Sequence, residues 1–169
     1  MTVSAGELLD SEALWRFSLA FYARPGVSEA LIALQDHARC DVNLMLFALW
    51  LGVSGRSRLT KEELAIATRI ARPIGADIVE PLRGLRRKLR SDPDADVQRL
   101  REGIKALELA AEKILQNRLA RIAGPAGRAD PARRAAAAHA NLALYLGRKM
   151  TGSSEAATIG TALEVLLRG

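Results

Sequence analysis

Residues 41–52 read Asp-Val-Asn-Leu-Met-Leu-Phe-Ala-Leu-Trp-Leu-Gly and contain the longest uninterrupted apolar run of the chain, Leu44–Leu51. Asp41 is suited to cap the amino end of a helix, because its carboxylate can accept hydrogen bonds from the first free amides. Gly52 is suited to end that helix. A helix that is apolar on nearly every side must be enclosed by other elements. We therefore expect Val42–Leu51 to form a central buried helix.

Further helix signals flank this segment. Arg24-Pro25-Gly26 separates two apolar periodic stretches on the amino-terminal side. On the carboxyl-terminal side, Thr60 and Glu63 have the spacing of a capping box. We expect the next long segment to be broken at three helix-disrupting residues, Pro73, Gly75 and Pro81.

A long helix is predicted over residues 93–122, where apolar residues recur at spacings of three and four. About thirty helical residues would span about 45 Å, enough to cross a domain or to reach a partner. The sequence thus predicts an all-α bundle of about seven or eight helices in one domain, 1–169. This long helix is also a candidate surface for self-association.

Composition agrees with a helical protein. The chain has 169 residues, 49% apolar and only 4% aromatic. Alanine and leucine dominate and β-branched valine is scarce, which favours helix over sheet. Such a composition disfavours a β-barrel, a disordered tail protein and a disulfide scaffold. Six of the seven aromatic residues fall within residues 14–52, so the core is expected there.

Cysteine and histidine, the usual ligands of zinc, are scarce in the chain. Cys40 is the only cysteine, and His37 and His139 are the only histidines, so a Cys/His zinc site is not expected. We predict no metal and no cofactor. No apolar run approaches the length of about 18 to 20 residues that a membrane span needs, and no signal peptide opens the chain. We expect a cytoplasmic location without a transmembrane segment.

Residues 14–52 resemble the motif block of a family of uncharacterised bacterial helical proteins, classed as a domain of unknown function. The pieces that carry the resemblance are Trp15-Arg16-Phe17-Ser18-Leu19, Tyr22-Ala23-Arg24-Pro25-Gly26-Val27, Leu34-Gln35-Asp36, Asp41-Val42-Asn43-Leu44 and Leu49-Trp50-Leu51-Gly52. The resemblance implies a small helical bacterial protein and brings no established reaction.

Polar residues beside the apolar helix define a first candidate site. Buried polar groups need partners, because an unpaired one costs about 1–3 kcal/mol. One interpretation is structural: Asp41 caps a helix, Arg24 pairs with an acid and Asn43 satisfies a turn. The other is a ligand pocket or partner groove formed by Arg24, Asp41, Asn43 and Trp50.

Positive charge defines a second candidate. The net charge of +6 divides into −3 on residues 1–55 and +9 on the basic helical remainder, 56–169. Its densest segment is expected to be an amphipathic helix, with Leu82, Leu85 and Leu89 facing inward. The candidate basic surface comprises Arg83, Arg86, Arg87, Lys88 and Arg90.

Three functions are compatible with these features. The first is a non-catalytic protein-interaction or adaptor module whose partner is a protein. The second is a small-molecule-binding helical enzyme with its site near Arg24, Asp41 and Asn43. The third is a nucleic-acid-binding accessory protein that uses Arg83–Arg90, weakly supported because no groove-entering motif or aromatic stacking platform accompanies the arginines.

Overall fold

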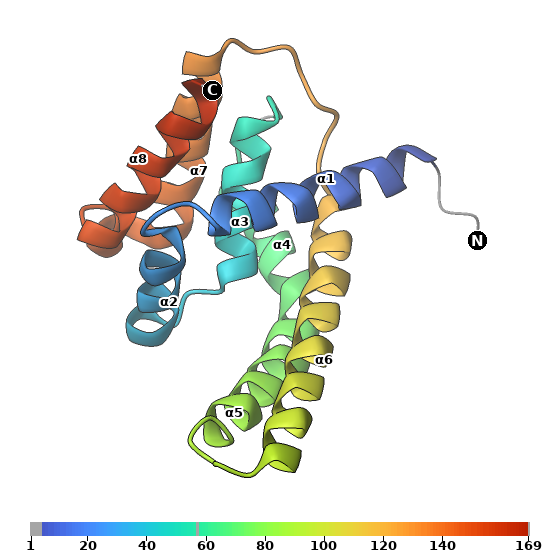
Figure 1. Ribbon diagram of the computed structural model, residues 1–169. Helices are drawn as coiled ribbons and strands as arrows, with labels where there is room; N and C mark the ends of the chain where they lie inside the picture. Colours follow the sequence, from blue (N-terminus) through green and yellow to red (C-terminus); the bar gives the residue numbers. More distant parts are fainter. Residues whose placement is uncertain (1–4, 57, 169) are drawn as a thin grey trace.

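The computed structural model describes residues 5–56 and 58–168, and every regular element among them is a helix (Figure 1). This confirms the expected all-α bundle. The elements, in order, are α1 (Ala5–Tyr22), α2 (Val27–Ala38), α3 (Val42–Val53), α4 (Lys61–Ile74), the π-helical segment η1 (Gly75–Val79), α5 (Glu80–Lys88), α6 (Ala95–Ala120), α7 (Pro131–Met150) and α8 (Ser154–Arg168).

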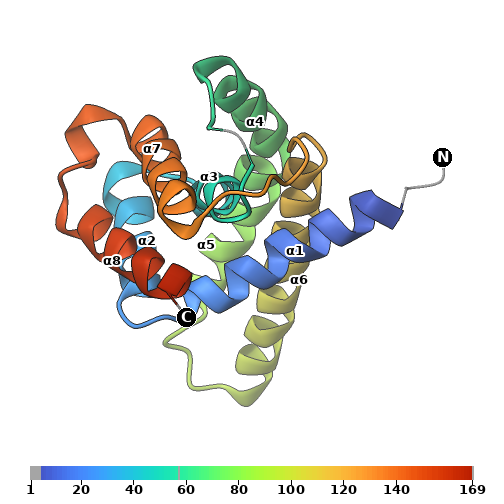
Figure 2. The same ribbon diagram turned by 90° about the horizontal axis from the view of Figure 1, so that it is seen from above.

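Helix α3 is the central element, as predicted. The residues from Val42 to Gly52 are all buried, and Figure 2 shows α3 enclosed by helices on several sides. Asp41 caps the helix, because its carboxylate accepts from the backbone amides of Asn43 and Leu44. The predicted capping box of Thr60 and Glu63 is present too, and Asp130 caps α7.

Two apolar clusters lie on opposite sides of α3. One joins α3 to α2, α7 and α8, and its largest fully buried members include Leu31, Met45 and Leu163. The other joins α3 to α1, α4 and α6 around Phe47, Trp50 and Leu115. Because both clusters use α3, its unusually apolar sequence is explained by burial from two directions.

Gly52 does not end α3, which continues to Val53. The reason for glycine here is packing against α7. A Cβ atom at position 52 would lie 2.2 Å from the backbone nitrogen of Ala138, so only a glycine lets the two helices approach this closely. The expectation that Gly52 terminates the helix was wrong.

The break expected at Pro73, Gly75 and Pro81 is also absent. Pro73 lies inside α4, and the chain passes through η1 directly into α5. Pro81 lies in the first turn of α5, directly after the π turn. Single π turns occur mostly inside longer α-helices, which is the position that η1 has here. The three elements α4, η1 and α5 are therefore one bent, continuous helical segment.

Helix α6 covers most of the range expected for the long helix, with Asp94 as its capping residue. It packs beside α5 and is crossed by α1 (Figure 1). Among the described residues, no helix is both long and apolar enough to cross a membrane.

Candidate functional site

Two adjoining cavities open beside the amino-terminal end of α3. The larger, about 350 Å³, lies between α1, α2, α3, α5 and α6, and we name it the Arg86 cavity. The smaller, about 270 Å³, faces α4, η1 and α5, and we name it the Asp41 cavity. Four residues line both cavities: Gln35, Val42, Asn43 and Arg83. A polar group at this shared boundary can therefore serve either cavity.

Asn43 is the most deeply placed polar group at this boundary, with a residue exposure of 4%. Ser18 Oγ donates to Gln116 Oε1 at 3.0 Å, and Gln116 Nε2 donates to Asn43 Oδ1 at 2.9 Å. This buried chain uses the amide oxygen of Asn43. Its Nδ2 group has no hydrogen bond to a described residue, while Asn43 lines both cavities. The fold thus holds a hydrogen-bond donor ready for an acceptor in the cavities.

Two arginines of α5 meet two glutamates of α6 on the wall of the Arg86 cavity. Glu108 accepts from Arg83 Nε at 2.9 Å and from Arg86 at 2.5 Å and 3.2 Å. Glu112 accepts from Arg83 at 2.7 Å. Two bonds from one guanidinium fix the plane of a carboxylate, so Glu108 holds α5 and α6 in a defined register.

The pKa values of these glutamates shift in opposite directions. Burial raises the pKa of Glu108. The hydrogen bond from Arg86 and the charges of both arginines lower this pKa by more than burial raises it, so the net shift is downward. Burial raises the pKa of Glu112, and the nearby charge of Glu108 adds to that shift. Burial and then Glu112 raise the pKa of Tyr22, which lines the same cavity.

Asp41 lines the smaller cavity and is closely surrounded by other residues. Its backbone N–H donates to Tyr145 Oη at 2.7 Å. Burial raises the pKa of the carboxyl group, although its two hydrogen bonds from Asn43 and Leu44 oppose that shift. A Cβ atom at Gly75 would lie 3.0 Å from Asp41 Oδ2. The π turn of η1 therefore brings backbone close to this carboxylate with no side chain between them.

Apolar residues also line the Arg86 cavity. Leu19, Ile32 and Leu109 line it, and their side chains are among the exposed large hydrophobic groups of the protein, at 52%, 40% and 43% exposure. Trp15 and Leu46 extend the same apolar surface. The lining of the cavity thus combines apolar side chains with charged and hydrogen-bonding ones, the combination expected for an amphipathic ligand.

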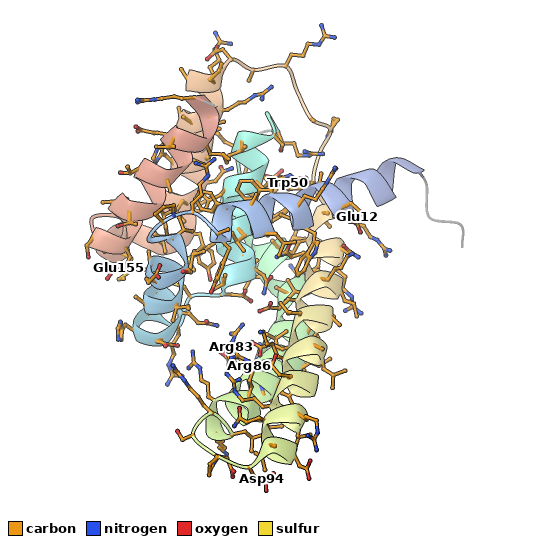
Figure 3. The ribbon with its side chains drawn as sticks, in the orientation of Figure 1. Glu12, Trp50, Arg83, Arg86, Asp94 and Glu155 are labelled. Atoms are coloured by element: carbon orange, nitrogen blue, oxygen red, sulfur yellow. The ribbon has the colours of Figure 1, made fainter. Side chains whose placement is uncertain are left out.

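The structure brings together members of both candidate sites from the sequence. Asp41 and Asn43 lie beside Arg83, while Arg86 and Arg87 line the larger cavity. Arg24 and Trp50 line neither of the two cavities. Trp50 lies in the core under the guanidinium of Arg56, 4.1 Å from the ring centre, and Figure 3 shows it well separated from Arg83 and Arg86.

The basic surface differs from its expected form. Arg83 and Arg86 turn toward α6, with side chains 13% and 26% exposed, whereas Leu85 is 50% exposed. The glutamates of α6 explain this rotation of α5, because buried carboxylates need cationic partners. Arg87, Lys88 and Arg90 are exposed, and Arg87 pairs with Asp36 at 3.0 Å.

Sequence reasoning missed the contribution of α6 to the site. Glu108, Glu112 and Gln116 recur at intervals of four, which places them along one side of the helix. That polar row, set against Arg83 and Arg86 at a spacing of three, is the signal that could have revealed the cluster. The three-membered chain through Ser18 could not be foreseen, because it joins residues 98 positions apart.

A model of the family described as "protein of unknown function (DUF2390)" matches residues 13–119. The chain belongs to this family. The match confirms the resemblance to a family of unknown function and reaches well beyond residue 52. All residues of the Arg86 cavity fall inside the DUF2390 region, whereas Tyr145 of the Asp41 cavity falls outside it. No curated protein and no solved structure matches the chain.

The described residues offer no cluster of three or more His, Cys, Asp or Glu side chains placed to hold a metal ion. The side chains that line the two cavities can recognise a ligand by hydrogen bonds, charge and apolar contact.

Proposed function

We propose that this DUF2390 protein binds a small amphipathic molecule, with an apolar body and an anionic head, in the Arg86 cavity. The observation that carries the proposal is the buried amide of Asn43. Its oxygen is occupied by Gln116, and its nitrogen is left as a donor at the cavity boundary. A bound acceptor would give this donor a partner, and a hydrogen bond to an anionic head is stronger than one to a neutral group.

The charges of the cavity favour an anionic head. Four cationic side chains line it, Arg83, Arg86, Arg87 and Lys105, against two carboxylates, Glu108 and Glu112. Glu108 and Glu112 engage Arg83 and Arg86 through only some of their N–H groups. A guanidinium has five donors in a fixed fork, so donors remain for an incoming carboxylate or similar group.

The apolar residues of the cavity lining favour a hydrocarbon or aromatic body. Exposed Leu19, Ile32 and Leu109 would lose contact with water when such a body binds, and removing apolar surface from water gives about 25 cal/mol per Å². The volume of about 350 Å³ lies within the usual range for a small-molecule site.

Titration calorimetry with decanoate tests this function directly. Decanoate has an apolar chain and a carboxylate head, and we expect saturable binding to one site. Decyltrimethylammonium has a similar chain with a cationic head, and we expect it to bind at least about tenfold more weakly, since the cavity carries an excess of positive charge.

A pair of variants at the carboxyl-terminal end of α1 and just beyond it locates the binding. Ala23 lines the cavity, whereas Ala20 is exposed and lies outside it. Ala23→Trp should fill the opening and weaken decanoate binding at least about tenfold. Ala20→Trp adds the same group three residues earlier, in the last turn of α1, and should leave binding unchanged. No binding of decanoate, equal binding by the Ala23→Trp variant, or equal binding of the cationic probe would contradict the proposal.

The protein-interaction and nucleic-acid functions stay predictions, as does the cytoplasmic location. For nucleic acid, the exposed cations of the basic segment are Arg87, Lys88 and Arg90, and Arg87 pairs with Asp36. Binding to generic DNA that falls steeply with salt would favour it, and no binding at low salt would reject it.

A further inference from the structure

Helix α6 carries an exposed row of large apolar side chains. Leu100, Leu107 and Ile114 are 57%, 60% and 50% exposed and stand seven residues apart. We name these three residues the α6 ridge. Figure 1 shows α6 along the edge of the molecule opposite α8. A spacing of seven keeps side chains in one nearly straight line on a helix, as in a coiled coil.

Small residues lie beside the ridge on the same face. Gly103 and Ala110 fall between the ridge positions and are exposed. A Cβ atom at Gly103 would meet no other atom within 4 Å. The face therefore alternates large and small side chains, so that the large groups of one such face can fit over the small groups of another.

Opposite charges stand at the two ends of this face. At 100° per residue, Asp96 precedes the ridge and Arg121 follows it on the same side of the helix. Both are exposed, and Asp96 also pairs with Arg99 of its own helix. Two such faces attract each other when the helices run antiparallel, whereas a parallel arrangement places Asp96 against Asp96.

We propose that the α6 ridge docks a second copy of this chain, antiparallel and about a two-fold axis level with residues 108 and 109. In this register Leu107 packs over Ala110 of the second copy and Ile114 over its Gly103. Asp96 then lies opposite Arg121 of the second copy. Each contact occurs twice, as a two-fold interface requires.

Sedimentation equilibrium over a range of concentrations tests this interface. The wild-type chain should shift from monomer to dimer as its concentration rises. Leu107→Glu places two carboxylates at the centre of the interface and should raise the dissociation constant at least about a hundredfold. Val165→Glu changes a residue of similar exposure, 55%, on α8 and should leave dimerisation intact.

A charge exchange tests the antiparallel register without changing the ridge. Asp96→Lys and Arg121→Glu should each raise the dissociation constant about tenfold at low salt, since each creates two repulsive pairs. The double variant restores opposite charges and should recover most of the affinity. Circular dichroism checks that every variant keeps its helices.

Three results would overturn the proposal. They are a wild-type chain that stays monomeric at the highest concentration, a Leu107→Glu variant that dimerises like the wild type, and a double charge variant that dimerises more weakly than either single one. The interface is independent of ligand binding, because the α6 ridge residues line neither the Arg86 cavity nor the Asp41 cavity.

Discussion

Glu108 and Glu112 stand one helical turn apart on α6, yet their surroundings give them different roles. Glu108 accepts three hydrogen bonds from two arginines, and its pKa is lowered. Glu112 accepts one, and burial keeps its pKa raised. Glu108 is thus a structural anion between α5 and α6, while Glu112 is costly to ionise at the edge of the cavity.

Glu108→Gln should lower the free energy of unfolding by about 3 kcal/mol at neutral pH, because it removes a buried charge from two arginines. The lowered pKa means that this contribution is complete above the ordinary value of 4.5 and is lost as pH falls through the folded-state pKa. Urea denaturation at several pH values measures it. A difference from wild type that does not shrink in acid would contradict this role.

Glu112→Gln should have the opposite pH dependence. A raised folded-state pKa favours the folded state when the group is protonated, so wild-type stability from this group falls as pH rises through that pKa. Glutamine cannot ionise, so the stability of the variant does not decrease in this way. Its melting temperature relative to wild type should therefore increase between about pH 4 and about pH 7, and a constant difference across that range would disprove the assignment.

The hydrogen bonds of Asp41 could be predicted from the sequence, whereas those between Arg83 and Glu108 could not. The cap of α3 follows from a carboxylate placed just before an apolar run, which involves neighbours in the sequence. Partners such as Arg83 and Glu108 are separated by 25 positions and depend on how α5 turns against α6. An amphipathic pattern locates the helix but not which arginine meets an acid.

At the scale of elements, glycine positions decide how closely helices approach. Gly52 lets α3 touch the backbone of α7, and Gly75 lets η1 approach Asp41. The sequence alone suggested that both residues end or break helices. The structure shows that both remain within continuous helical segments, because the missing side chain serves tertiary packing rather than chain reversal.

Gly52→Ala should destabilise the protein by about 3 kcal/mol, since its Cβ atom would overlap the backbone of Ala138 and force α3 and α7 apart. Gly84→Ala on α5 is the matched control. A Cβ atom there meets nothing within 4 Å, and the change should stabilise the protein by about 1 kcal/mol through helix propensity. Thermal unfolding of both variants measures these effects, and equal melting temperatures would refute the packing argument.

At the scale of the molecule, the fold joins the aromatic motif block to the basic segment. The central helix, its cap and the all-α class follow from apolar periodicity, which is a local property. The Arg86 cavity does not, because it is enclosed by helices from residues 15 to 116 and exists only when α5 and α6 fold back beside α1 and α2. Two candidate sites that look separate along the chain thereby share one boundary at Asn43.

The side-chain amide of Asn43 provides the most direct test of the proposed ligand site. Its ¹H–¹⁵N resonances can be followed by NMR during a titration with decanoate. Asn141 is a matched reference: it is also buried, but its oxygen accepts from the backbone N–H of Leu59 and its nitrogen donates to the backbone carbonyl of Ala48. We predict that the Asn43 amide shifts saturably while the Asn141 amide does not. An unmoved Asn43 amide, or equal shifts at both residues, would contradict the assignment of the Arg86 cavity as a binding site.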